Sequence, residues 1–291
     1  GMMDCKKALT ECEGDIAKAV DWLREKGIAK AAKKATRIAA EGLCDVAING
    51  NKAYVYELNS ETDFVAKNDE FKDLINTILN LLIESNVSSV EEALALTTSD
   101  GTLSDTITNK IAKIGEKISF RRFELVTKSD NEVFGTYIHM GGKIGVLVDV
   151  ETDVVNPAIE EMARNVAMQI AALKPQYTSD SEVSAEYIEH EKEILMAQIQ
   201  NDPKESQKPE KVIQGMITGR IKKELKEICL LDQVYVKAED GKQSVAQYVA
   251  QVAKANNATV AVKGFVRFET GEGMEKKEED FAAEVAKQMN M

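Results

Sequence analysis

The sequence predicts an α+β protein whose central part consists of two similar halves. Three observations support this prediction. A pattern of strand, glycine turn, strand and helix occurs twice, and the stretches that follow each copy carry apolar residues at helical spacing. A polar loop with prolines also separates two long helical stretches. Further helical segments are predicted at the beginning and at the end of the chain.

The repeated pattern runs through residues 47–63 and again through residues 138–153. In each copy two strand-like runs flank a glycine turn, and Glu-Thr-Asp follows the second run. The Asn49-Gly50 pair strongly indicates a β-hairpin. A matching strand follows later in each half, at 120–124 and 265–269. Each half is therefore expected to be a small antiparallel sheet with helices on one face.

The helices of both halves are predicted from apolar residues at i, i+3, i+4 and i+7 spacing and from capping residues. In the second half Asn156 is expected to cap a helix whose first residue is Pro157. Pro175 follows the end of that helix. The other helices of the two halves are predicted at 63–84, 90–96, 104–116 and 244–254.

Residues 1–37 are predicted to form two short helices and a basic segment. Gly14 is expected to end the first helix, Asp15 to cap the second and Gly27 to end it. Two short helices bury little apolar surface, so a third helix is expected to pack with them. The segment 29–37 has four positive charges and no acid. A nucleic-acid patch and a solvated helical linker both fit it, and the acidity of the whole chain favours the linker.

Residues 180–229 interrupt the second half and are predicted to form an antiparallel helical hairpin. Two long helices with narrow apolar stripes are joined by the polar loop 201–209. Narrow stripes are typical of coiled coils. Part of the stripe on the second helix is expected to stay exposed, which makes the hairpin the place where two copies of the chain would associate. This stripe consists of Ile213, Ile217, Ile221 and Leu225.

The last part of the chain is predicted to be an amphipathic helix that follows a glycine hinge. Gly271 and Gly273 are expected to form the hinge. A separate amphipathic helix after a hinge is typical of a segment that docks on a partner protein. The apolar stripe of this helix consists of Phe281, Val285 and Met289.

Charge and composition argue against several functions. The 291 residues carry a formal net charge of −12. This charge argues against direct binding to nucleic acid or to an anionic membrane surface, because both need a basic face. No apolar run reaches the roughly 18 residues of a membrane span. The four cysteines are scattered without a metal-ligand spacing, which is typical of a protein of the reducing cytoplasm.

The sequence also lacks a pattern of catalytic residues. The chain has two histidines, His139 and His190, and nothing marks a nucleophile or a metal site beside either of them. The glycine-rich stretch 141–145 lacks the spacing of a phosphate-binding loop and fits a hairpin turn better. The prediction is a protein that is not an enzyme and that uses no cofactor or metal.

The strongest candidate for a functional site is the segment 59–68, which leads from a predicted strand into a predicted helix. Ser60, Thr62 and Asp63 are all good helix N-cap residues, and Phe64 lies in the first turn. An exposed ring at a capped helix tip can insert into a partner protein. The apolar spacing of the helix also fits a Phe64 that is buried in the core, and periodicity alone favours that position.

Three motifs of the chain resemble bacterial elongation factor Ts, the guanine-nucleotide exchange factor of elongation factor Tu. They are Thr-Asp-Phe-Val-Ala-Lys-Asn at 62–68, Met-Met-Asp-Cys-Lys-Lys-Ala-Leu at 2–9 and Phe-Val-Arg-Phe-Glu-Thr-Gly-Glu-Gly at 265–273. The resemblance implies a translation factor that releases GDP from elongation factor Tu and stabilises the nucleotide-free GTPase until GTP binds. The alternative is a non-catalytic adaptor that uses the helical module and the hairpin to hold proteins together.

The resemblance also assigns contacts with elongation factor Tu to particular residues. Asp63 and Phe64, flanked by Thr62 and Val65, would enter the GTPase and disturb its magnesium and phosphate region. The resemblance implies four further contacts. Ile114 and Gly115 would form a second core contact, and His139 would form a contact near the sheet. Met2 and Met3 would form an N-terminal contact, and Phe281, Val285 and Met289 a C-terminal contact.

Pattern and resemblance together divide the chain into five parts. They are a helical module with its linker at 1–37, the first half of the core at 38–124, the second half at 125–179 and 230–264, the coiled-coil or dimerisation hairpin at 180–229, and a C-terminal strand and docking helix at 265–291. The resemblance implies that the helical module is of the ubiquitin-associated type and places its first helix before Gly1.

Overall fold

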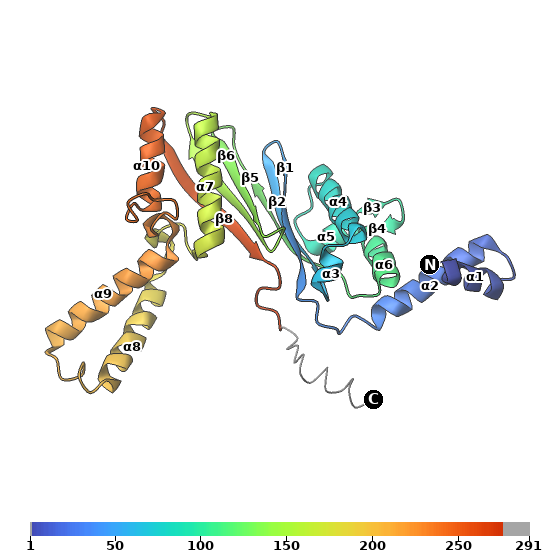
Figure 1. Cartoon of the computed structure of the whole chain (residues 1–291), viewed down its shortest axis with the longest axis horizontal. Helices are drawn as coiled ribbons and strands as arrows, with labels where there is room; N and C mark the ends of the chain where they lie inside the picture. The colour runs from blue at the N-terminus through green and yellow to red at the C-terminus, as the bar shows by residue number, and fades with distance from the viewer. Residues whose placement is uncertain (1, 276–291) are drawn as a thin grey trace. The chain divides into compact units, whose positions relative to one another are not determined.

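The computed structural model describes residues 2–275 and shows a mixed α+β protein (Figure 1). The predicted C-terminal helix, with Phe281, Val285 and Met289, lies outside the described residues. The chain forms two compact units. The first takes its described residues from the ranges 1–126, 138–144 and 268–291, and the second takes them from 127–137 and 145–267.

The first unit is built on a three-stranded sheet in the order β1-β2-β5. β1 (Glu41–Asn49) and β2 (Lys52–Ser60) are antiparallel and pair along their full lengths, and β5 (Ser119–Thr127) lies beside β2. The predicted hairpin is confirmed. Its two-residue turn is Gly50-Asn51, one position later than expected, and Gly50 has a φ of +58°.

Four helices of the first unit follow β2 in the sequence, and they correct one prediction. They are α3 (Asp63–Ala66), α4 (Asp69–Glu84), α5 (Val90–Leu94) and α6 (Leu103–Ile114). The prediction of a single helix over 63–84 is therefore wrong. The side chain of Asn68 accepts a hydrogen bond from the backbone of Glu70 at 2.8 Å and starts α4 as a separate helix. A short strand pair that the sequence did not predict, β3 (Thr97–Thr98) and β4 (Gly101–Thr102), lies between α5 and α6.

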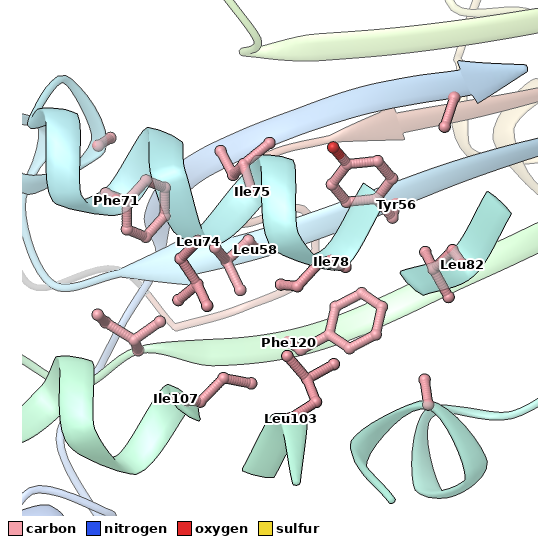
Figure 2. Close-up of a cluster of buried hydrophobic side chains, with 14 of the residues drawn as sticks. Tyr56, Leu58, Phe71, Leu74, Ile75, Ile78, Leu82, Leu103, Ile107 and Phe120 are labelled. Atoms are coloured by element: carbon pink, nitrogen blue, oxygen red, sulfur yellow. The ribbon is translucent and has the colours of Figure 1, made fainter. Parts of the chain in front are cut away.

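The hydrophobic core of the first unit lies between the sheet and α4 and α6 (Figure 2). Aromatic rings of β2 and β5 meet there, with Tyr56 and Phe120 in an edge-on arrangement at 6.5 Å. The apolar stripe of α4 faces these rings, as its spacing predicts. The fully buried members with the largest side chains are Tyr54, Tyr56, Leu58, Phe71, Leu74, Ile78, Leu82 and Leu103.

The N-terminal helices are α1 (Met2–Glu11) and α2 (Ile16–Ala32), and α2 packs against α6. The side chain of Asp15 caps α2 by accepting a hydrogen bond from the backbone of Lys18 at 3.1 Å, as expected. The prediction that Gly27 ends this helix is wrong. Gly27 is buried inside the helix, and a Cβ at this position would lie 3.6 Å from the Cβ of Ala112 in α6.

The second unit is built on a sheet in the order β6-β7-β8, and its helices α7 and α10 pack against each other. The Asn156 side chain caps α7 at 3.0 Å from the Ile159 nitrogen, with Pro157 in the first turn, as predicted. Gly135 of β6 touches α7, because a Cβ there would lie 2.3 Å from the backbone of Ala163. The bounds are β6 (Glu132–His139), β7 (Ile144–Thr152), α7 (Pro157–Leu173), α10 (Val245–Ala255) and β8 (Val260–Glu269).

Two long helices of the second unit, α8 (Ala185–Asn201) and α9 (Glu210–Ile228), follow each other in the sequence and pack together (Figure 1). Short 3₁₀ turns lie before and after the pair, at Asp180–Glu182 and Leu230–Asp232. Their contact is a small apolar cluster, in which Ile199, Ile217 and Ile221 are buried. Coiled-coil packing and self-association of this pair stay predictions.

The segment after β8 corrects the predicted glycine hinge. Gly271 has a φ of +72°, and a Cβ at this position would lie 2.1 Å from the carbonyl oxygen of Ala40. Its backbone nitrogen donates to the buried carboxylate of Glu57 at 2.8 Å. Close packing and this hydrogen bond hold Gly271 in place, so it is not a hinge. Gly273, with a φ of +70°, has no heavy atom within 4 Å of such a Cβ.

Candidate partner-binding site

Residues 62–67, here called the tip, connect β2 to α4 in the first unit. Thr62 has an extended backbone and its hydroxyl oxygen accepts a hydrogen bond from the Val65 nitrogen at 3.3 Å, so Thr62 is the N-cap of α3. The hydroxyl of Ser60 donates to the Thr62 carbonyl oxygen at 2.9 Å. Local side-chain bonds thus determine where the short helix begins.

Phe64 lies on the outside of the tip and is 80% exposed. A core position for this ring, which periodicity alone favours, is therefore wrong. The expectation assumed one continuous helix that aligns Phe64 with Phe71, whereas the break at Asn68 separates the two residues. Val65 is 9% exposed and Ala66 is 3% exposed, and both join the core beneath the tip. The tip presents the ring of Phe64, and the next two residues, Val65 and Ala66, anchor the tip in the core.

Asp63 is the first residue of α3 rather than its cap. Its carboxylate forms an ion pair with Lys67, at 2.7 Å from Oδ2 to Nζ. The hydrogen bond from Lys67 is the main reason why the pKa of Asp63 is below its usual value, and the charge of Lys143 lowers it further. At neutral pH the tip therefore carries an ionised carboxylate beside an exposed ring.

The second predicted contact lies at the end of α6. Gly115 ends this helix with a φ of +91°, and its nitrogen donates to the Ile111 carbonyl oxygen at 2.9 Å. A left-handed residue at this position is a common way to end a helix and favours glycine. Ile114 is half-buried against the core of the first unit, while Gly115 is exposed. Glu116, the next residue, reaches back to the base of the tip.

The third predicted contact, His139, lies at the end of β6, where the chain turns toward β7. The turn is fastened to β1, because the Cys44 nitrogen donates to the Gly142 carbonyl oxygen at 2.6 Å. The hydroxyl of Thr270 donates to the same oxygen at 3.1 Å. His139 is half-buried, and Met140 beside it is 74% exposed. No pattern in the sequence singles out this methionine.

A buried carboxylate supports the sheet behind the tip. Glu57 of β2 is fully buried and forms ion pairs with Arg121 at 3.1 Å and Arg122 at 2.6 Å. Burial alone would raise the pKa of Glu57, but the hydrogen bonds from Gly271, Asn59 and Arg122 outweigh it and lower the pKa. The charge is thus fully partnered, which a buried carboxylate requires.

The remaining predicted contacts are at the two ends of the chain. Met3 lies on α1 and is 75% exposed, and Met2 is the first residue of this helix. Phe281, Val285 and Met289 fall outside residues 2–275. The residues that the sequence did not point to are Glu116, Glu57 and Lys143. Their partners are far away in the sequence, so neither spacing nor composition signals them.

Among residues 2–275 no group of three or more His, Cys, Asp or Glu side chains could hold a metal ion. The four cysteines, all within this range, form no disulfide, and Cys44 and Cys229 are buried. No helix within the same residues combines the length and apolarity needed to cross a bilayer.

The described residues define an α+β protein whose candidate site is a tip with an exposed aromatic ring, which is a form suited to binding another protein. A protein-family model described as elongation factor Ts matches residues 61–272, well over half of the chain. The chain therefore belongs to the elongation factor Ts family. Membership in this family implies nucleotide exchange on elongation factor Tu during translation elongation, with elongation factor Tu as the partner.

Proposed function

We propose that this protein binds elongation factor Tu in its GDP form and releases GDP by inserting the tip into the magnesium and phosphate region of the GTPase. The exposure of Phe64 is the observation that carries the proposal. A ring that is 80% exposed in the free protein has most of its apolar surface left to bury on a partner. Val65 and Ala66 anchor the tip below it, so the ring is presented in a fixed position.

The mechanism is a coupling between two binding equilibria. A protein that binds nucleotide-free elongation factor Tu more tightly than the GDP form must weaken GDP binding by the same factor. The tip is ordered before binding by the Thr62 cap and by its buried anchors, which reduces the entropy lost on association. More of the contact energy is then available to stabilise the nucleotide-free state.

Asp63 contributes a negative charge next to the inserted ring. Its carboxylate is ionised at neutral pH, as the lowered pKa requires. Near a magnesium ion and phosphate groups, such a charge attracts the cation and repels the phosphates. Both effects weaken the arrangement of ion and phosphates that holds GDP.

The other contacts that the resemblance implies are part of the same proposal. Ile114, Gly115 and His139 belong with the tip to one compact unit, and Met3 on α1 is exposed. We place the N-terminal contact at Met2 and Met3, and the C-terminal contact at Phe281, Val285 and Met289. The helices of 180–229 would carry any coiled-coil association between two copies. The exchange takes place in the cytoplasm, with no direct contact to nucleic acid or membrane.

Labelled GDP tests the proposal directly. Elongation factor Tu is loaded with fluorescent GDP, and its release is followed in the presence of excess unlabelled GDP, with and without this protein. The proposal expects a large acceleration by the wild-type chain and a much smaller one by Phe64→Ala. If the chain binds elongation factor Tu but leaves the release rate at its spontaneous value, the adaptor interpretation replaces exchange.

A further inference from the structure

Two loops meet at the base of the tip. The carboxylate of Glu116 accepts hydrogen bonds through Oε2 from the Glu61 nitrogen at 3.1 Å and from the Thr62 nitrogen at 3.0 Å. Its other oxygen, Oε1, accepts from the Thr62 hydroxyl at 2.7 Å. One side chain at the end of α6 therefore holds three donors of the segment that enters the tip.

The same two loops are connected in the opposite direction. Oε1 of Glu61 accepts from the Lys117 nitrogen at 2.6 Å. The guanidinium of Arg37 lies 3.3 Å from the same oxygen, and the Lys117 ammonium donates to the Arg37 carbonyl oxygen at 2.9 Å. Residues 61–62 and 116–117 are thus joined reciprocally, with charged groups on both sides. Hydrogen bonds to charged groups are the stronger kind.

The connection continues into the tip through the hydroxyl of Thr62. This hydroxyl donates its proton to Glu116, and its oxygen accepts from the Val65 nitrogen at 3.3 Å. The donation fixes the rotation of the hydroxyl, so the acceptor lone pairs are directed toward the start of α3. A helix of four residues has little stability of its own, so its direction depends on the cap and on the packing beneath it.

We propose that Glu116 is a positioning residue that orients the tip and holds it at a fixed place relative to the Ile114–Gly115 turn. The inference rests on the proposed function, in which Phe64 enters the GTPase. Glu116 follows directly after the turn, so its bonds to Thr62 make the tip and the turn one rigid surface. Elongation factor Tu then meets both contacts in their binding arrangement, and less ordering is left for the complex.

Glu116→Gln is the variant that tests this role. Glutamine keeps the shape of the side chain but replaces one acceptor oxygen by an NH₂ donor, which cannot accept from Glu61 or Thr62. The matched control is Glu70→Gln. Glu70 also binds α6, through ion pairs with Lys110 and Lys113, but has no bond to residues 61–62.

Two measurements follow each variant. Amide hydrogen exchange of Thr62 and Val65 in the free protein reports whether the tip is held. GDP release from elongation factor Tu reports whether holding it matters. Glu116→Gln should expose both amides and slow release about tenfold, the factor expected for one lost charge-assisted hydrogen bond. Glu70→Gln should leave both readouts at their wild-type values.

Thr62 variants separate positioning from a general loss of structure. Thr62→Ser keeps the hydroxyl and should keep the amide protection at positions 62 and 65, while Thr62→Val removes the hydroxyl and should lose this protection and slow release as Glu116→Gln does. The double variant Thr62→Val/Glu116→Gln should be scarcely slower than either single variant, because both changes break the same chain of hydrogen bonds. Full additivity of the two effects would contradict a shared role.

Phe64→Ala in the same series distinguishes failure of this inference from failure of the proposed function. Slow release by Phe64→Ala with wild-type release by Glu116→Gln refutes the positioning role alone, whatever the amides show. Wild-type release by Phe64→Ala refutes insertion of the tip, and the positioning role with it. Slow release by both variants, with loss of amide protection only in Glu116→Gln, supports both proposals.

Discussion

Replacing Phe64 by alanine should separate exchange activity from stability. A phenylalanine side chain offers roughly 150–250 Å² of surface, and the ring of Phe64 is 80% exposed. The remaining fifth, taken at about 25 cal/mol per Å², amounts to about 1 kcal/mol of unfolding free energy. Phe64→Ala should therefore unfold at nearly the wild-type denaturant concentration.

Phe71, seven residues further along, is the matched control for stability. It is fully buried in the core of the first unit, and Phe71→Ala should cost about 3–5 kcal/mol. GDP release should behave in the opposite way. Phe64→Ala should slow it at least about tenfold, which corresponds to roughly 1.4 kcal/mol of lost coupling in the nucleotide-free complex.

The assay is a pair of measurements on each variant, a urea unfolding curve and a rate of fluorescent GDP release from elongation factor Tu. If Phe64→Ala unfolds at as low a urea concentration as Phe71→Ala, the ring of Phe64 supports the fold. Wild-type release by folded Phe64→Ala would show that the ring is not what enters the GTPase. Either result refutes the reasoning from exposure to insertion.

Three further predictions concern the fold. Gly27→Ala should raise the unfolding free energy by about 0.5–1 kcal/mol, since Gly27 lies inside a helix with room for a methyl group; a lower melting temperature would contradict this. Gly271→Ala should destabilise the protein more than Gly273→Ala, because only at Gly271 would the added methyl group clash with a carbonyl oxygen. Gly273→Ala should cost only the strain of a left-handed backbone, about 1–2 kcal/mol. Equal urea midpoints of the two variants would support a hinge at Gly271. Hydrogen bonds from two lysines lower the pKa of Glu70 from 4.5 to about 2, so the stability that Glu70 contributes is present above pH 4.5 and is lost as pH falls toward 2. The unfolding free energies of wild type and Glu70→Gln should therefore converge over this pH range. A difference that stays constant with pH would disprove the linkage.

Local patterns in the sequence predicted the elements that depend on local chemistry. The hairpin of β1 and β2 follows from two strand-like runs around a glycine turn, and its antiparallel register is observed. Asn156 and Asp15 start helices α7 and α2 because their side chains accept hydrogen bonds from backbone nitrogens three residues later. Pro157 fits the first position of α7. Such interactions can be predicted from residues that are close together in the sequence.

The errors arose where a glycine or an asparagine has two possible roles. The sequence pattern places Asn68 inside one continuous helix, but in the structure its side chain starts a new helix. Gly27 and Gly271 fit a helix end and a hinge, yet both are packed against residues distant in the sequence, Ala112 and Ala40. Local spacing cannot show a close approach that only the folded chain creates.

The candidate site shows the same division. The motif at 62–68 drew attention to Asp63 and Phe64, and the structure places Phe64 on the surface. Glu116 could not be found in this way, because its partner Thr62 is 54 residues away in the sequence. A single glutamate after a helix carries no signal until the two loops are seen together.

The most direct test of the account is the affinity of this protein for elongation factor Tu with and without GDP. Calorimetric titration should give a much tighter complex with the nucleotide-free GTPase than with the GDP form, and the ratio of the two affinities should equal the factor by which the protein weakens GDP binding. Phe64→Ala should bring the two affinities closer together, mainly by weakening the nucleotide-free complex. Equal affinities of the wild-type protein for the two forms would contradict exchange by this mechanism, however tightly the protein binds.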